Sequence, residues 1–189
     1  MKISVTYSLS DDNAFTIDVT AVSDQDTVCC ITNHSYFNLS GSGEIHTHQF
    51  QVNADGYTPF LPDLLPSGEI APVEGAGLDF HTFRVLPSPE FDRNFALRPG
   101  HTVCASARDP HSGIQMDVIS DLPALQIYDG YAMSPRTGKN GSHYGPYSGV
   151  CLEPQFFPDS PHKPQFPSCI LPAGEIYHHA LQYRFSTVQ

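Results

Sequence analysis

Short stretches in which apolar and polar residues alternate recur along most of this chain. Residues 3–9 and residues 15–21 alternate with a period of two, and an Asp-Asp-Asn sequence at 11–13 separates them. Successive side chains of a strand point to opposite faces, so this period predicts two strands and the polar turn predicts an antiparallel hairpin. A β-branched run over residues 27–32 predicts a third strand of the same meander.

Further strands are predicted at intervals through the rest of the chain, whereas helices are not. The 17 prolines and 14 glycines interrupt nearly every window that is long enough for a helix. The passage from residue 55 to residue 72, which carries four of the prolines, is predicted to be irregular. We therefore predict an all-β protein with an antiparallel β-sandwich. The further strands are expected at residues 46–52, 95–97, 102–107, 114–119, 125–128, 149–153 and 183–185.

Length and charge narrow the classes of protein that fit this pattern. The 189 residues are predicted to form a single domain, because no internal repeat or linker divides them. The 20 acidic and 9 basic residues give a net charge of −11, which argues against nucleic acid or an anionic membrane as a partner. Five cysteines, no signal-peptide pattern and no apolar run long enough to span a bilayer indicate free thiols in the cytoplasm.

The first candidate for chemistry is His34, which follows the β-branched run and has Asn33 and Tyr36 close by. An unperturbed imidazole has a pKa near ~6.5, so His34 can act as an acid or a base at neutral pH. The alternative is a capped strand end whose histidine only satisfies backbone groups.

Two carboxylates beside apolar residues are the next candidates. Asp92 lies between aromatic residues just before a predicted strand, and Glu153 ends another predicted strand. Apolar surroundings raise the pKa of a carboxyl group, which can then serve as a base at neutral pH. The plainer alternatives are a turn residue for Asp92 and a solvated strand end for Glu153. His46 and His48 share a face of a predicted strand, but two ligands without a third seldom form a metal site, so no metal is predicted.

Seven short motifs follow one another in a fixed order along the chain. They are Asn-His-Ser-Tyr-Phe-Asn-Leu at 33–39, Ala-Asp-x-Tyr-Thr-Pro at 54–59, Leu-Pro-x-Gly-Glu-Ile-x-Pro-Val at 65–73, Phe-Asp-x-Asn-Phe at 91–95, Cys-Leu-Glu-x-Gln at 151–155, Phe-Pro-Asp at 157–159 and Leu-Pro-x-Gly-Glu-x-Tyr at 171–177. In this order they resemble the aldose 1-epimerases, also called galactose mutarotases. The resemblance runs over nearly the whole chain.

The resemblance implies a β-supersandwich whose open cleft binds a free hexose and needs no cofactor. His34 matches the acid of the family, Glu153 matches its base, and Asp92 matches the carboxylate that holds sugar hydroxyls. Gln126 resembles a further sugar contact. Asn33 and Tyr36 are expected in the sugar site as well, and Phe157 or Tyr36 is expected to offer a ring face to the C–H side of the sugar. No cluster of arginines suited to a phosphate group is present, so the implied substrate is glucose or galactose itself.

The chain departs from the family pattern in two places. Residues 128–131 read Tyr-Asp-Gly-Tyr where the family usually reads Tyr-Thr-Gly-Asn. Family members also carry an N-terminal half with an arginine and a histidine that complete the sugar site, and this chain begins about where that half ends. We therefore expect interconversion of hexose anomers with weak activity, or alternatively a non-catalytic sugar-binding β-sandwich or an inactive truncated mutarotase. A sheet surface left exposed by the missing half predicts a homodimer or poor solubility.

Overall fold

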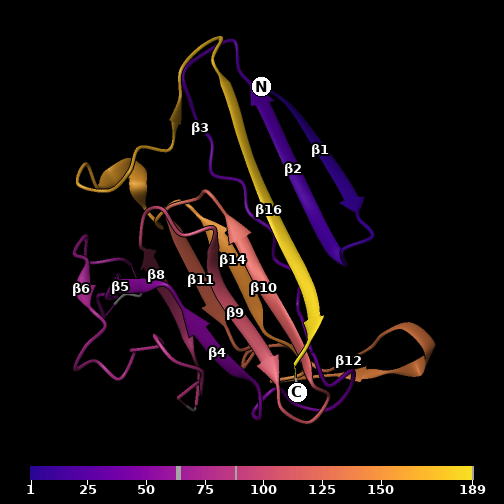
Figure 1. Ribbon diagram of the computed structural model, residues 1–189. Helices are drawn as coiled ribbons and strands as arrows, with labels where there is room; N and C mark the ends of the chain where they lie inside the picture. The colour runs from indigo at the N-terminus through magenta and orange to yellow at the C-terminus, as the bar shows by residue number, and fades with distance from the viewer. Residues whose placement is uncertain (63–64, 88, 189) are drawn as a thin grey trace.

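Two antiparallel sheets make up most of the regular structure in the computed structural model, which describes residues 1–62, 65–87 and 89–188 (Figure 1). The prediction of an all-β sandwich is confirmed. The larger sheet contains, in spatial order, β1 (Lys2–Leu9), β2 (Ala14–Val22), β16 (Ile176–Thr187), β10 (Ile114–Ser120), β9 (Val103–Asp109), β4 (Gln49–Val52) and β7 (Arg84–Val85). The smaller sheet contains β14 (Cys151–Gln155), β11 (Ala124–Tyr128), β8 (Asp92–Leu97), β5 (Ala54–Tyr57) and β6 (Ala71–Pro72).

Two pairs of short strands lie outside the two sheets. β3 (Thr27–Val28) pairs with β15 (Ile170–Leu171), and β12 (Arg136–Thr137) pairs with β13 (His143–Tyr144). Two 3-10 turns, η1 (Lys139–Gly141) and η2 (Ser160–His162), are the only helical elements among the described residues. No helix in this part of the chain has the length and hydropathy needed to cross a membrane.

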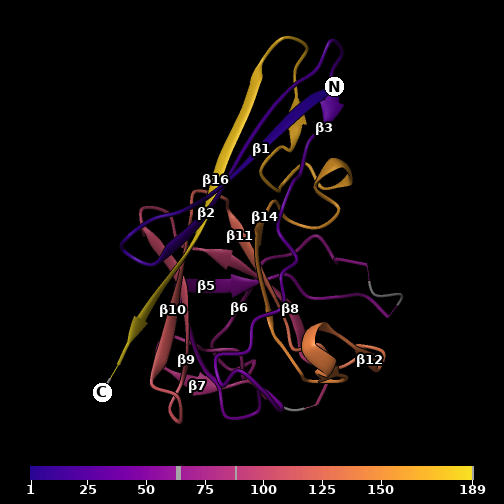
Figure 2. The ribbon, with the colours of Figure 1, turned by 90° about the vertical axis from the view of Figure 1, so that its right-hand side faces the viewer.

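One hydrophobic core draws side chains from both sheets. Met116 and Val118 enter it from β10, whereas Phe95 and Ile127 enter it from β8 and β11. Figure 2 shows β9 and β10 on one side and β8, β11 and β14 on the other. Burial of such side chains is the main favourable contribution to the folded state, so this shared core fixes the two sheets against each other.

The predicted meander of three strands is wrong. The β-branched run at 27–32 forms a strand only at Thr27–Val28, and that strand pairs with β15 instead of β2. The second edge of β2 is occupied by β16. Because Leu181 and Tyr183 of β16 are buried in the core, pairing at this edge removes more apolar surface from water than the short run can. β16 also extends far beyond the predicted strand at 183–185.

Other predicted boundaries need correction as well. The passage expected to be irregular contains most of β5. The alternation of apolar and polar residues in this strand is interrupted by Gly56, which has no side chain. An added Cβ at Gly56 would lie 2.5 Å from Cγ2 of Ile70. The ladder between β5 and β8 shifts register at this glycine, as is common where another segment of the backbone approaches closely. Asp92 is the first residue of β8 and does not precede the strand, and Glu153 lies in the middle of β14 instead of at its end.

Candidate active site

Three neighbouring strands carry polar side chains to one face of the smaller sheet. Glu153 of β14 is paired with Gln126 of β11, which is paired in turn with Asn94 of β8. Directly paired residues project to the same face, so these three side chains form a row. The residues next to each of them along its strand point to the opposite face. Leu125 and Ile127, on either side of Gln126, are fully buried in the core. The register thus gives the sheet one apolar face and one polar face.

A second row on the polar face contains Cys151, Tyr128 and Asp92. The side-chain amide of Gln126 donates a hydrogen bond to the Asp92 carboxylate, which links the two rows. The Gln126 Oε1 atom is buried and has no hydrogen-bond partner among the described residues. A buried acceptor without a partner costs free energy, so this position favours a ligand that can donate a hydrogen bond.

His34 reaches the same face from the segment that follows β3. The backbone on its C-terminal side is fixed by two hydrogen bonds between Phe37 and Val150, with N···O distances of 2.8 and 2.9 Å. On its N-terminal side the Asn33 Oδ1 atom accepts a hydrogen bond from the Ser35 N–H at 3.0 Å. This turn, typical of asparagine, sets the direction in which the His34 side chain leaves the backbone.

The His34 ring lies between a thiol and a carboxylate. Its Nδ1 atom is 3.3 Å from the Sγ atom of Cys151, and its Nε2 atom is 3.6 Å from the Oε1 atom of Glu153. The Tyr36 ring stacks on it at a centroid distance of 5.2 Å, and the Tyr128 ring meets it edge-on at 6.2 Å. The side chain of His34 is nevertheless 55% exposed, so one edge of the ring is open to a ligand.

The side chains of His34, Tyr128 and Glu153 border an open cleft of about 430 Å³, a size that suits a small ligand. Cys151 is fully buried and is not among the lining residues. Of the six residues predicted for the site, His34, Asp92, Gln126 and Glu153 line this cleft. Asn33 and Tyr36 are not among the lining residues and contact the site through the His34 turn and ring. Phe157 does not line the cleft either, because its ring is buried and stacks on that of Phe166. The remaining lining residues are Phe60, Tyr128, Tyr131, Gln155 and Pro158.

Sequence reasoning missed several of these residues, although a signal for two of them was present. Gln155 lies two residues after Glu153, and Tyr128 lies two residues after Gln126. The period of two therefore places each pair on the same face of its strand. Phe60 and Pro158 come from irregular segments for which no such period exists.

The departure from the family pattern at 128–131 has a structural role. The buried carboxylate of Asp129 accepts hydrogen bonds from the backbone N–H groups of Phe91 at 2.9 Å and of Tyr131 at 3.0 Å. Gly130 has a φ of +73°, and an added Cβ there would lie 2.7 Å from the carbonyl oxygen of Gly149. The Asp-Gly pair thus fixes the turn that carries Tyr131 to the cleft.

Burial dominates the electrostatics of Glu153. It raises the pKa of this carboxyl group to about 7, and the charge of Asp92 acts in the same direction, whereas the nearby His34 imidazole acts to lower it. Burial and the charge of Glu153 also raise the pKa of the Cys151 thiol, which is therefore protonated at neutral pH. A carboxyl group with a pKa near 7 exists in both protonation states under physiological conditions, as a general base requires.

His46 and His48 lie in different surroundings and do not share a strand face. His48 is fully buried, and its Nε2 atom accepts a hydrogen bond from the Leu39 N–H at 2.9 Å. His46 is exposed and lies 3.4 Å from a carboxylate oxygen of Glu44. The strand begins only at Gln49, so the shared face on which the pair was expected is absent.

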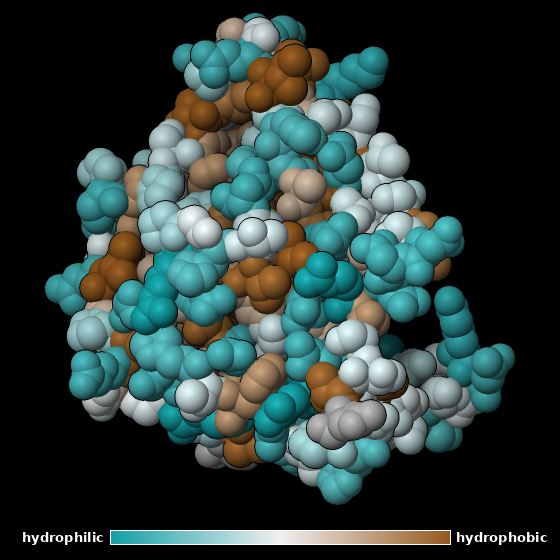
Figure 3. Space-filling view, in the orientation of Figure 1, coloured by the Kyte–Doolittle hydropathy of each residue, from teal (hydrophilic) through white to brown (hydrophobic). Residues whose placement is uncertain are grey.

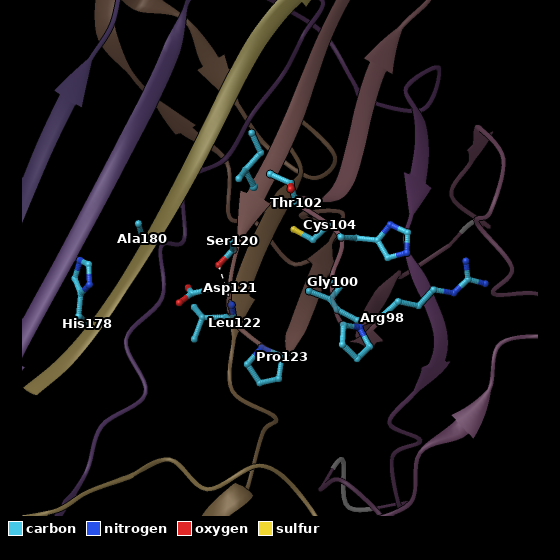
Figure 4. A pocket seen from close by; sticks show the side chains of 14 residues that line it. Arg98, Gly100, Thr102, Cys104, Ser120, Asp121, Leu122, Pro123, His178 and Ala180 are labelled. Atoms are coloured by element: carbon cyan, nitrogen blue, oxygen red, sulfur yellow. Dashed lines mark hydrogen bonds between the residues drawn. The ribbon is translucent and has the colours of Figure 1, made fainter.

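A larger cavity of about 740 Å³ lies elsewhere on the molecule (Figure 4). Arg98 and Gly100 border it from one loop, Asp121 and Leu122 from another, and His178 from β16. Its lining contains none of the residues that line the cleft with His34 and Glu153. The chemistry of the polar cleft therefore identifies the candidate site better than cavity size does.

The fold and the cleft define a class of protein, an antiparallel β-sandwich that places a histidine and two carboxylates in an open cleft. Solved structures of this class resemble the chain closely. An aldose epimerase homologue from C. elegans superimposes with a TM-score of 0.92 and 27% identity, covering 99% of this chain and 60% of that one. The galactose 1-epimerase of Lactobacillus acidophilus superimposes with a TM-score of 0.84 and 25% identity, covering 99% and 57%.

Sequence comparisons give the family. The aldose 1-epimerase family pattern matches residues 1–184. Galactose mutarotase of Mus musculus is 39% identical over 98% of this chain, and aldose 1-epimerase of Escherichia coli is 31% identical over 96%. The chain belongs to the aldose 1-epimerase family, and it spans 58% of the length of these two relatives.

Proposed function

We propose that this protein interconverts the α and β anomers of a free hexose by acid–base opening of the sugar ring. The observation that carries the proposal is the pair formed by His34 and Glu153, whose Nε2 and Oε1 atoms lie 3.6 Å apart in a cleft. Membership of the aldose 1-epimerase family supports it, as do the relatives named galactose mutarotase and aldose 1-epimerase.

In the proposed mechanism Glu153 removes the proton of the C1 hydroxyl and His34 protonates the ring oxygen. The bond between C1 and the ring oxygen then breaks and leaves an aldehyde. Rotation about the adjacent carbon–carbon bond presents the other face of the carbonyl, and the reverse proton transfers close the ring. Both reacting oxygens are attached to C1, so two carriers that lie side by side can reach them together. Each positioned carrier contributes roughly 10²–10⁴-fold, and the ring opening itself needs no redox change.

The other cleft residues supply contacts for the sugar. The Asp92 carboxylate can accept hydrogen bonds from hydroxyl groups, and the buried Gln126 Oε1 atom offers a further acceptor. The rings of Tyr128 and Tyr131 provide apolar surface for the C–H face of the hexose. The lining described for this cleft includes no lysine or arginine, which favours a free sugar over a sugar phosphate.

Polarimetry of freshly dissolved α-D-galactose and α-D-glucose tests the proposal. We expect the purified chain to shorten the approach to the equilibrium rotation relative to buffer, in proportion to protein concentration. A chain that binds galactose in calorimetry without changing this rate would instead be a sugar-binding module. A chain that does neither would contradict both functions.

We also propose that the chain is a single domain that works in the cytoplasm and forms a homodimer. The core shared by both sheets supports a single domain, and five free cysteines favour a reducing compartment. The exposed apolar residues of β1, among them Ile3, Val5 and Tyr7, support association of two copies. The net charge of −11 supports the exclusion of nucleic acid and anionic membranes as partners.

A further inference from the structure

Cys151 forms a compact cluster with the two proposed proton carriers. Its Sγ atom, one ring nitrogen of His34 and one carboxylate oxygen of Glu153 all lie within 4.8 Å of one another. Within residues 1–62, 65–87 and 89–188 this is the only such group of three side chains. The proposed ring opening requires the imidazole and the carboxylate but gives no role to the thiol.

The cluster contains the ligand types that a thiophilic cation needs, at separations somewhat larger than those of a bound site. Zinc binds thiolate, imidazole and carboxylate at about 2.0–2.3 Å, so ligand atoms around a tetrahedral ion are separated by roughly 3.3–3.7 Å. The distance from Cys151 Sγ to His34 Nδ1 is 3.3 Å, and that from His34 Nε2 to Glu153 Oε1 is 3.6 Å. These two distances involve different ring nitrogens, so they do not belong to one coordination sphere. One ligand atom from each of the three residues lies within 4.8 Å of the other two, so binding of an ion requires the side chains to draw together by up to about 1.5 Å.

Charge and access also favour a divalent ion at this position. A thiolate and a carboxylate together carry two negative charges, which balance the charge of the ion. The cleft is open to solvent on the side of His34, whereas Cys151 is fully buried and does not line it. An ion would therefore enter past the His34 ring and keep its fourth coordination position on that side for water. A soft sulfur ligand disfavours magnesium and calcium, which prefer oxygen ligands.

We propose that Cys151, His34 and Glu153 bind a thiophilic divalent cation of the zinc class, and that this ion competes with the sugar. On binding, the thiol releases its proton to water and the sulfur becomes a ligand, with no change of oxidation state. The ion occupies the lone pairs that His34 and Glu153 would use for proton transfer, so it inhibits the reaction. The competitive part of this inference rests on the proposed mutarotase function.

Cobalt(II) is a direct probe, because a thiolate ligand gives it a charge-transfer absorption in the near ultraviolet. We expect the metal-free full chain to develop this absorption up to one equivalent of CoCl₂ and to lose it when ZnCl₂ is added. Cys151→Ser should abolish the absorption. Glu153→Gln should retain it while weakening cobalt binding by at least about 10-fold, the smallest effect usually seen even for groups outside the ligand shell. Saturating galactose should raise the apparent dissociation constant for cobalt.

Cys30→Ser is the matched control, because Cys30 is exposed and is the natural position for adventitious binding to a thiol. This variant should keep the absorption. An absorption that is lost in Cys30→Ser but kept in Cys151→Ser overturns the proposal, as does the absence of any absorption in the unmodified chain. Circular dichroism of each variant establishes that it is folded, and Glu153→Gln provides a second test of the same cluster if Cys151→Ser does not fold.

Polarimetry separates this proposal from the proposed function. We expect zinc at a concentration that saturates the cobalt site to abolish mutarotation and EDTA to restore it. Cobalt absorption without mutarotation would support the metal site and contradict the proposed enzymatic function. Mutarotation that is insensitive to zinc, together with no cobalt absorption, would support the proposed function and contradict the metal site.

Discussion

Glu153 carries the clearest prediction at the scale of a single residue. Its burial raises the pKa of the carboxyl group to about 7, and the group acts as a base only when it is deprotonated. We therefore expect Glu153 to give the pH–rate profile an ascending limb near pH 7, above which the rate is limited by the need for a proton on His34. Glu153→Gln should lower the rate by ~10²-fold or more and remove this pH dependence, and His34→Asn should lower the rate similarly.

The measurement is polarimetry across a pH series with buffer blanks, since mutarotation also proceeds slowly in buffer. Glu175→Gln is the matched control, because Glu175 is an exposed carboxylate outside the cleft. It should retain both the rate and the pH dependence. A pH profile of Glu153→Gln that matches that of the unmodified protein would assign the base to another group.

The same carboxyl group should limit the stability of the folded protein at high pH. Its pKa is about 7 in the folded state against 4.5 for the unperturbed group, so the folded state binds the proton more tightly. The contribution of this group to the free energy of unfolding is then highest at low pH and falls as the pH rises from about 4.5 through 7. Each pKa unit corresponds to about 1.4 kcal/mol, so the loss is roughly 2–4 kcal/mol.

Glu153→Gln removes this charge and should make the protein more stable than the unmodified chain at pH 8. At pH 4, where the carboxyl group is protonated in the folded state, the difference should be small. Urea unfolding at both pH values checks this. A variant less stable than the unmodified protein at pH 8 would mean that the contacts of the carboxylate outweigh its burial.

Individual residues of the site could be predicted only where a motif marks them. His34, Asp92, Gln126 and Glu153 lie in segments that resemble the family, and all four line the cleft. Cys151 was part of a motif too, but its contact with His34 depends on a segment more than a hundred residues away. A pattern of period two gives the face of a strand and not the neighbours across it.

At the scale of elements, the alternation in β11 separates two functions on opposite faces of one strand. Ile127 is fully buried in the core, and its neighbour Gln126 faces the cleft. We expect Ile127→Ala to lower the free energy of unfolding by about 2–5 kcal/mol, because it leaves a cavity in the core. Gln126→Ala should change stability much less and should weaken the binding of galactose.

Urea unfolding and calorimetry with galactose measure the two effects on the same pair of variants. Ile127→Ala serves as the control for binding, since it alters the strand without touching the cleft. Equal losses of stability in both variants would indicate that the two faces of β11 are not distinct. Equal losses of affinity would indicate that the sugar does not contact Gln126.

Strand positions could be predicted well where apolar and polar residues alternate along one strand. They were predicted poorly where pairing with a distant strand sets the length of the strand. β1, β2, β10 and β11 match their predicted segments closely. β5 escaped prediction because Gly56 leaves no side chain to show a period. β16 was predicted too short, since His178 and His179 interrupt the alternation, although pairing with β2 continues through both. These features depend on contacts between distant segments, which no local pattern contains.

At the scale of the whole molecule, the exposed apolar face of β1 is the surface best suited to association with another protein chain. Ile3, Val5, Tyr7 and Leu9 are all exposed, and they project to the same face as the residues of β2 with which they pair, which are buried except for the half-buried Phe15 opposite Leu9. The apolar face of the large sheet thus continues onto an edge strand whose outer side has no strand partner among the described residues. Brown residues are also visible at the upper end of the face shown in Figure 3.

A second copy of the chain can cover this edge, because β1 is self-complementary. When two β1 strands run antiparallel with Thr6 opposite Thr6, Val5 lies opposite Tyr7, and all apolar side chains fall on one face. Lys2, the only charged residue of the strand, lies opposite Ser10, so no like charges meet. A shift by one residue would place apolar side chains opposite polar ones, which disfavours that register. We therefore expect a two-fold symmetric dimer.

Val5→Lys should dissociate this dimer, because an inward-pointing charge on an edge strand opposes pairing with another edge. Ser4→Lys is the matched control: it adds the same charge to the neighbouring residue on the polar face and should leave most of the dimer intact. Sedimentation velocity over a range of concentrations measures the association, and circular dichroism establishes that β1 remains folded in both variants. A monomeric unmodified protein at high concentration would contradict the dimer. Equal dissociation by the two variants would show that charge repulsion, and not the apolar face of β1, controls the association.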